Sequence, residues 1–245
     1  MEMKSYNFIT LEKRGKTCIL KLNRPEKKNA MSEAMRAEII DALETLKDEK
    51  KIKAVVVYGG EDFFCAGFDR DEVQAMLGGE NWNQFIESSS LFHRTFLEFP
   101  KLLIAAVNGY ALAGGFDLAL LCHLRLASRS AVFGHPEISF GACPLFFPLM
   151  TLVGRGKAIE LTLNTSSKDT FINTEEAYRL NIVNKIVESG IVLDEALKIA
   201  KNINKSPEFA VGQLLLVSNS FFNRYEAFET EMNVIVENMK KMLNL

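Results

Sequence analysis

The chain has 245 residues, 48% of them hydrophobic and 24% charged, which is the composition of an ordered globular protein with a sizeable core. Its formal net charge of −2 offers no basic field to gather the phosphates of a duplex, so we expect no nucleic-acid partner. No apolar run reaches the roughly 20 residues of a membrane-spanning helix, and the charged N-terminus does not resemble a secretory signal, so we expect no membrane partner and a cytoplasmic location.

The N-terminal part begins with a strand and an amphipathic helix. Residues 17–22 are mostly apolar and β-branched and stop at Asn23-Arg24-Pro25, which predicts a strand followed by a loop. Ser32 is a favourable helix N-cap, and apolar residues between Met35 and Leu46 recur at offsets of three and four. This spacing predicts a helix with one buried face.

Two short apolar runs, residues 54–58 and 102–107, indicate strands that are buried on both faces. They are closed by Gly59-Gly60 and Asn108-Gly109, respectively. The helix between them is expected to end near Phe99-Pro100, because a residue before proline disfavours the helical conformation. The order strand, helix, strand predicts an α/β fold with βαβ units and a mostly parallel sheet.

The C-terminal part is predicted to be helical. Beyond Val187 no further strand is indicated, and breaks are expected at residues 206–207 and 218–220. We therefore divide the chain into an α/β core, 1–190, and a helical module, 191–245. The last helix carries an apolar stripe that would pack either on its own domain or on a partner subunit, formed by Tyr225, Phe228, Met232, Ile235, Met239 and Met242.

Two glycine-bearing corners, residues 63–69 and 108–117, follow the two buried strands. In an open α/β sheet, ligands bind beyond the carboxyl ends of the strands, so both corners would meet at one crevice. Glycine leaves backbone N–H groups unobstructed, and a helix starting near Gly115 adds its positive end. Two converging N–H groups make an oxyanion hole, whereas either corner taken singly is more often a tight turn.

The remaining signatures point away from metals and separate cofactors. The sequence has no G-x-G-x-x-G after a strand, no Walker loop and no H-E-x-x-H, and its four cysteines form no C-x-x-C pair. The three histidines, His93, His123 and His135, have no metal-ligand spacing among themselves. We expect them to be surface or satisfied core residues, and we predict no metal site.

Five collinear stretches form an ordered set that is far more specific than any one of them. They are residues 22–25 with 29–31, 64–69, 104–111 with 114–115, 133–137, and 153–155 with Ala177. Through them the chain resembles the crotonase family, also called the enoyl-CoA hydratase/isomerase family, from about Tyr6 to the C-terminus. The resemblance implies a spiral of ββα units, an acyl-CoA thioester as substrate with no cofactor besides its CoA moiety, and self-association as a trimer or hexamer through the C-terminal module.

The resemblance also implies site residues. The N–H groups of Phe68 and Gly114 would form the oxyanion hole for the thioester oxygen. Lys27 and Lys28 would meet the phosphates of CoA, although solvated loop lysines fit this pattern equally well. Binding of CoA and substrate is implied for Arg24, Lys28, Ala30, Ala66, Gly67, Phe68, Asp69 and Gly114.

Asp117 and Glu137 are the predicted catalytic acids. Family hydratases carry two glutamates twenty residues apart, and these two carboxyl groups keep that separation, 137 − 117 = 20. Two carboxyl groups facing one pocket can divide acid and base duties because their like charges push their pKa values apart. Aspartate is one methylene shorter than glutamate, and in this position it resembles the dienoyl-CoA isomerases.

The stretch 141–148 departs from the family pattern. The isomerases have a third acid shortly after the second, whereas this stretch is apolar, contains two prolines and has no acid. We expect it to line the acyl pocket with bulk and to exclude water. The sequence therefore favours an enoyl-CoA hydratase, with a double-bond isomerase and a non-catalytic acyl-CoA-binding protein as alternatives.

Overall fold

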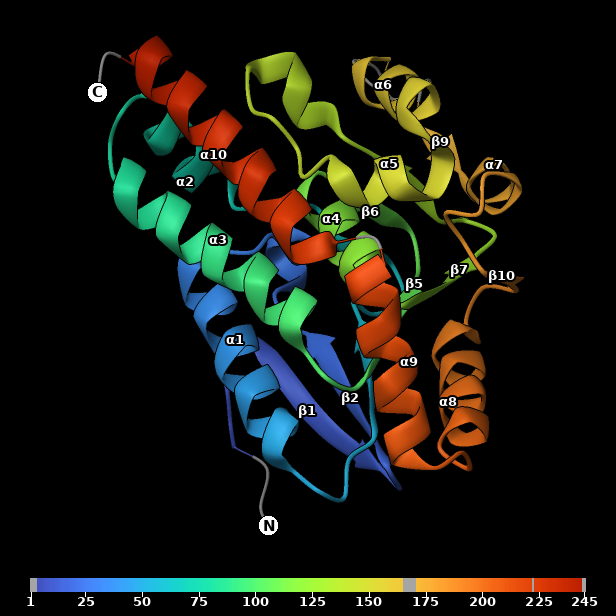
Figure 1. Ribbon diagram of the computed structural model, residues 1–245. Helices are drawn as coiled ribbons and strands as arrows, with labels where there is room; N and C mark the ends of the chain where they lie inside the picture. Colours follow the sequence, from blue (N-terminus) through green and yellow to red (C-terminus); the bar gives the residue numbers. More distant parts are fainter. Residues whose placement is uncertain (1–3, 165–170, 222, 244–245) are drawn as a thin grey trace.

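The computed structural model describes residues 4–164, 171–221 and 223–243. Its main layer is a six-stranded sheet of order β1-β2-β3-β5-β7-β10 (Figure 1). β1 and β2 form an antiparallel pair, and the other neighbours are parallel. The strands are β1 (Ile9–Arg14), β2 (Thr17–Leu22), β3 (Ala54–Tyr58), β5 (Leu102–Val107), β7 (Leu124–Ser128) and β10 (Lys185–Val187).

β3 and β5, the two apolar runs of the sequence, lie at the centre of this sheet, and every one of their residues is buried. Their side chains alternate between two cores, because successive residues of a strand point to opposite faces. Val55 and Leu103 belong to the core beneath α1 (Glu33–Asp48) and α3 (Trp82–Glu98). Val56 and Ile104 belong to the core beneath α8 (Val192–Ile203). The sheet is therefore covered on both faces.

A second, four-stranded sheet of order β4-β6-β8-β9 lies at the carboxyl ends of the main strands. β4 (Phe63–Cys65) follows β3 along the chain, β6 (Tyr110–Leu112) follows β5, and β8 (Val132–Gly134) follows β7. α2 (Arg70–Leu77) comes after β4, and α4 (Gly114–Leu121) comes after β6. These repeated strand, strand, helix units confirm the predicted α/β fold class.

The C-terminal helices pack on the same chain. α8 contacts β3, β5 and β7, and α10 (Arg224–Leu243) contacts α3 and α5, running alongside α3 in Figure 1. In the apolar stripe of α10, Phe228 is fully buried and Met232 packs against the main core. The stripe thus covers its own domain; the side chain of Met242 lies outside the described residues. The remaining described elements are η1 (Pro25–Lys27), η2 (Pro136–Phe140), α5 (Phe147–Val153), α6 (Arg155–Leu163), β9 (Ile172–Asn173), α7 (Thr174–Arg179) and α9 (Glu208–Phe221).

The predicted break at residues 218–220 is wrong, because α9 continues through these residues to Phe221. Serine and asparagine interrupt helices when their side chains bond to nearby backbone. Here the Asn219 amide group instead donates to the carbonyl of Leu97, at 3.3 Å, and accepts from Arg224, at 3.2 Å. Tertiary partners have replaced the local ones. Within the described ranges, no helix combines the length and apolarity that crossing a bilayer requires.

Candidate active site

The two glycine corners lie in contact at the carboxyl ends of β4 and β6. A Cβ atom built on Gly67 would come within 2.7 Å of the Ala113 Cβ and 3.1 Å of the Gly114 nitrogen, so the residue has no room for a side chain. Gly67 has a φ of 103°, and Ala113 has a φ of 51° with a ψ of −133°, a conformation rare for alanine. Strain of this kind is retained where the surrounding structure fixes it, commonly at functional sites.

The amides of Phe68 and Gly114 are both free to bind a ligand. Gly114 is the first residue of α4, where amides have no partner within the helix. Around Phe68, the amide of Met31 donates to Gly67 at 2.7 Å and the amide of Asp69 donates to Met31 at 3.1 Å. The intervening Phe68 N–H points the other way, as alternation along an extended segment requires. Neither amide has an acceptor among the described residues.

The loop before α1 is fastened to the first corner by polar side chains. The Asn29 amide group donates to the carbonyls of Gly59, at 2.6 Å, and Phe64, at 3.1 Å. Arg24 donates to the Ala30 carbonyl at 2.9 Å and pairs with Asp69 at 2.6 Å. These bonds fix the position of Lys27, Lys28 and Ala30 beside the site.

Most of the predicted site residues line a cavity of about 1030 Å³. Arg24 and Gly67 are not on its wall; Arg24 instead braces the loop through Asp69, and Gly67 supports the amide that follows it. α3 and α10 form the far wall, to which α10 contributes Met232, Ile235 and Met239. The predicted residues on the wall are Lys27, Lys28, Ala30, Ala66, Phe68, Asp69, Gly114, Asp117 and Glu137.

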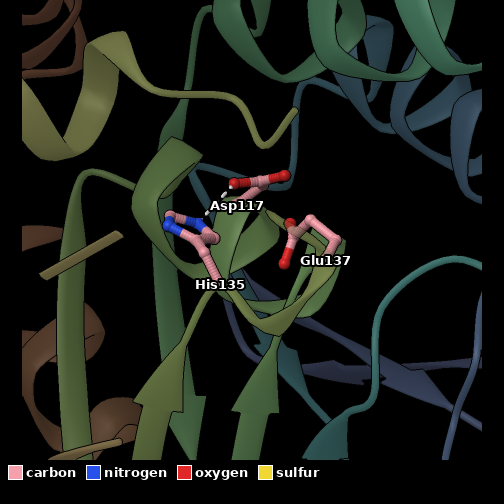
Figure 2. A group of neighbouring side chains, drawn as sticks. All are labelled: Asp117, His135 and Glu137. Carbon is pink, nitrogen blue, oxygen red and sulfur yellow. Dashed lines mark hydrogen bonds and ion pairs between the residues drawn. The ribbon is translucent and has the colours of Figure 1, made fainter. Parts of the chain in front are cut away.

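Asp117 and Glu137 both line this cavity, and their carboxyl groups lie close to each other and to the buried ring of His135 (Figure 2). Asp117 lies in the first turn of α4, and Glu137 lies in η2, which the strand β8 positions beside it. Both are deeply buried, with exposed fractions of 3% and 6%. His135 Nε2 and Asp117 Oδ1 are hydrogen-bonded at 3.0 Å. Glu137 Oε2 is buried and has no hydrogen-bond partner among the described residues.

Burial controls the protonation of this group of side chains. It raises the pKa of Asp117 well above its ordinary value, and it raises the pKa of Glu137 to about 8, a shift that His135 opposes and the Asp117 charge increases. Burial lowers the pKa of His135. Because burial disfavours the protonated imidazolium, the Asp117–His135 contact is a hydrogen bond to a neutral imidazole rather than an ion pair. The two carboxyl groups keep at least one proton at neutral pH.

Among the described residues, Asp117, His135 and Glu137 form the group that could hold a metal ion. One potential ligand atom from each lies within 4.8 Å of the others. Two carboxylates and one imidazole form a plausible ligand set for a divalent cation. A metal would, however, have to replace the His135–Asp117 hydrogen bond and draw the protons off two carboxyl groups whose pKa values are raised. The geometry therefore favours acid–base chemistry.

The apolar stretch 141–148 lines the cavity through Ala142, Cys143, Pro144 and Leu145, in agreement with the prediction. Its position is fixed by Glu231 of α10, whose carboxylate accepts the amides of Phe146 and Phe147, the latter at 2.9 Å. Burial raises the pKa of Glu231 to about 7, against the effect of these two hydrogen bonds. An acid from a distant helix thus braces a segment that has no acid of its own.

Three contributors to the site were not found in the sequence. All three histidines were expected to be surface or satisfied core residues; His135 is a satisfied core residue, but its partner is Asp117, whereas His93 is buried in the cavity wall with neither ring nitrogen paired among the described residues. The position of His135, two residues before Glu137, was the available signal for the first. Glu231 gave no local signal, because its partners lie more than eighty residues earlier.

Known proteins share this architecture and sequence. The profile of the enoyl-CoA hydratase/isomerase family matches residues 12–240. The crotonyl-CoA hydratase of Syntrophomonas wolfei is 36% identical over 84% of this chain and 79% of its own length, and the short-chain-enoyl-CoA hydratase of Clostridium acetobutylicum is 35% identical over 84% and 78%. The solved structure of enoyl-CoA hydratase subunit I from Geobacillus kaustophilus is similar with a TM-score of 0.82 and 29% identity, covering 96% of this chain and 91% of that one.

The fold of ββα units and the paired carboxyl groups in a common cavity define the class as a crotonase-fold enzyme. Since the family profile spans most of the sequence, the chain belongs to the enoyl-CoA hydratase/isomerase family.

Proposed function

We propose that this protein hydrates 2-trans-enoyl-CoA to 3-hydroxyacyl-CoA, through an enolate that an oxyanion hole stabilises. One observation carries the proposal: a single cavity contains two unpaired backbone amides, from Phe68 and Gly114, and two buried carboxyl groups, Asp117 and Glu137. The amides fit a thioester oxygen, and the acids lie where they would flank the carbons beside it.

The proposed reaction divides the acid and base roles between the two carboxyl groups. Asp117 takes a proton from water as the water oxygen bonds to C3, and the π electrons of the double bond move to the thioester oxygen. The N–H groups of Phe68 and Gly114 stabilise the negative charge that develops there. Glu137 then gives its proton to C2, and exchange with solvent returns the proton from Asp117 to Glu137.

The environments of the two acids support this division. A pKa of about 8 keeps Glu137 protonated at neutral pH, and its Oε2 has no hydrogen-bond partner among the described residues. The Asp117 carboxyl accepts a hydrogen bond from the Leu145 amide, which lowers its pKa against the effect of burial. In the tautomer of His135 that carries its proton on Nε2, His135 would donate a second hydrogen bond to Asp117. Hydrogen bonds to a carboxylate stabilise its charged form, as a base requires.

Coenzyme A is proposed to lie across the first corner and the loop before α1. Lys27 and Lys28 sit at the cavity wall on this side, and Ala30 and Ala66 leave room for a narrow chain. Lys27 is 3.8 Å from Asp71 and half-exposed, so its charge remains accessible to phosphate. Asp69 is committed to Arg24, so its role there is to position the loop.

A double-bond isomerase is the second candidate, and a specific observation favours it: the shorter acid Asp117 is bound to His135, and the apolar stretch 141–148 lines the cavity. An isomerase would move a proton between carbons with the same two acids. A non-catalytic acyl-CoA-binding protein is the third.

Assays with two substrates separate these candidates. A hydratase removes the conjugated thioester absorbance of crotonyl-CoA, whereas an isomerase acts on a dienoyl-CoA and leaves crotonyl-CoA unchanged. Replacing Glu137 by Gln keeps the shape and removes the proton, so we expect kcat to fall on the order of a hundredfold to ten-thousandfold. The Kd for a saturated acyl-CoA should stay the same. Unchanged turnover would refute the role of Glu137, and tight binding of several acyl-CoAs without turnover would favour the third candidate.

We also propose that the protein self-associates as a trimer or hexamer in the cytoplasm. α9 supports the first part, because it exposes a group of large apolar side chains: Phe209, Leu214, Leu216, Val217 and Phe221, all more than 60% exposed. Such groups mark association surfaces. The four free cysteines support a reducing compartment.

A further inference from the structure

His93 is a buried polar residue in the wall of the cavity that has no hydrogen bond to account for it. It lies on α3, is 5% exposed and lines the same cavity as Asp117 and Glu137. Neither of its ring nitrogens has a hydrogen-bond partner among the described residues. Buried polar groups are almost always paired, since an unpaired one costs the full desolvation of that group. A ligand in the cavity could supply the partner that the described residues do not.

The surroundings of His93 define what that partner can be. Its ring packs against Phe68, Phe92 and Phe228 with centroids 5.6–5.9 Å apart, so the site is largely apolar. Burial, with a smaller contribution from the nearby charge of Arg36, lowers the pKa of His93 to about 3. The ring is therefore neutral, with one N–H donor and one nitrogen acceptor.

A charged partner does not fit this environment. The neutral imidazole provides no counter-charge for a carboxylate, and the neighbouring cation, Arg36, already binds Glu72 at 3.0 Å and the Met31 carbonyl at 2.9 Å. A hydroxyl group can either donate to the ring or accept from it. Ser89, one turn earlier on α3, lines the same wall, so its hydroxyl is a second polar group there besides the His93 ring.

We propose that His93 selects acyl-CoA substrates with an uncharged hydrogen-bonding substituent, such as a hydroxyl, on the acyl chain. This inference rests on the proposed function, because it assumes that the cavity holds the acyl group of a CoA thioester. His93 is then a specificity-determining residue, and the reaction that supplies the substrate must leave oxygen on the acyl chain. A plain alkyl chain in the same place would leave the imidazole unpaired.

Binding of saturated ligands tests this without requiring turnover. The Kd would be measured by titration calorimetry for butyryl-, pentanoyl- and hexanoyl-CoA, each against the analogue with a terminal hydroxyl. We expect the wild-type protein to bind at least one hydroxy ligand about tenfold more tightly than its alkyl partner. His93→Leu should abolish this preference, raise affinity for the alkyl ligands and raise the melting temperature. His93→Gln, which keeps a donor and an acceptor, should retain part of the preference.

The possible failures are distinguishable. If none of the six ligands binds, the proposed acyl-CoA function itself is wrong. If alkyl and hydroxy ligands bind the wild-type protein equally, acyl-CoA binding stands and the selectivity of His93 is refuted. A preference that persists in His93→Leu also overturns the proposal. Should His93→Leu fail to fold, the wild-type ratio and His93→Gln still decide.

Discussion

Asp117 and Glu137 show how an apolar environment turns ordinary carboxyl groups into proton carriers. In water both would be ionised at pH 7, and neither would donate a proton. Burial at exposed fractions of 3% and 6% favours their neutral forms and leaves at least one proton in the pair. The same shift that suits them to catalysis makes them costly to ionise in the folded state.

The stability of the protein should therefore fall with rising pH across the titration of Glu137. Its pKa is about 8 in the folded state against 4.5 for the free side chain, so between these values the folded state holds a proton that the unfolded state has lost. Stabilisation is complete below the unfolded value and is lost as the pH rises toward the folded one. Glu137→Gln lacks this titration and should be more stable than wild type at pH 9 by on the order of 3–5 kcal/mol.

Urea unfolding at pH 5 and pH 9 measures this effect. The difference between the variant and wild type should be much larger at pH 9. Glu237→Gln, a substitution of an exposed glutamate on α10, is the matched control and should follow the wild-type curve. Parallel pH profiles for wild type and Glu137→Gln would show that Glu137 ionises freely in the folded protein.

For individual residues, the sequence predicted some members of the site and missed others. The spacing of Asp117 and Glu137, read through a family resemblance, placed both in one cavity, where the structure has them. It could not place His93, because which face of α3 meets the cavity depends on how α3 packs against α10. A histidine in a helix gives no sign of whether it will find a partner.

Among the elements, the corner between β4 and α2 depends on its residue type. Gly67 combines a positive φ with contacts that a Cβ atom would turn into a clash with Ala113. The same close approach sets the direction of the Phe68 and Gly114 amides. We therefore expect a change in the geometry of this corner to change kcat/KM as well.

Gly67→Ala should lower kcat/KM on the order of a hundredfold or more while the protein remains folded. The added methyl group must push the two corners apart and misplace the oxyanion donors. Gly190→Ala is a matched control, since it has a φ of 83° but nothing within 4 Å of the added atom. It should lower the melting temperature through strain alone and leave kcat/KM unchanged. Equal kcat/KM values for Gly67→Ala and wild type would remove the corner from the mechanism.

Strands whose residues are nearly all buried were predicted with the correct bounds, whereas a largely exposed strand and very short strands were not. β2, β3 and β5 have the predicted bounds because their apolar runs have clear ends. β1 and the short strands of the second sheet were not recognised, since β1 is largely exposed and the others have two or three residues. The break expected at residues 218–220 failed because Asn219 binds the distant Leu97 carbonyl and the side chain of Arg224 at the start of the next helix.

In the whole molecule, α9 is the element that exposes a large apolar face to solvent. Phe209 and Phe221 are 75% and 83% exposed, although α8 and α10 cover the core on either side of α9 along the chain. A monomer would leave this apolar surface in water. The proposed trimer or hexamer would bury it.

Sedimentation velocity should therefore give a mass of three or six chains for wild type. Replacing both Phe209 and Phe221 by Glu places charges in the proposed interface and should shift the mass toward one chain. Tyr178→Glu, at a 52% exposed aromatic on α7, is the control and should leave the mass unchanged. A monomeric wild-type protein would contradict the association.

α10 determines when a newly synthesised chain can become catalytically active. It supplies one wall of the cavity and, through Glu231, the brace of stretch 141–148, yet it spans residues 224–243. A chain still being made on the ribosome has the amides and both acids long before it has that wall. In a nascent chain without α10, a substrate would meet a cavity open to bulk water. The protein can therefore become active only after α10 has left the ribosome and packed against α3 and α5.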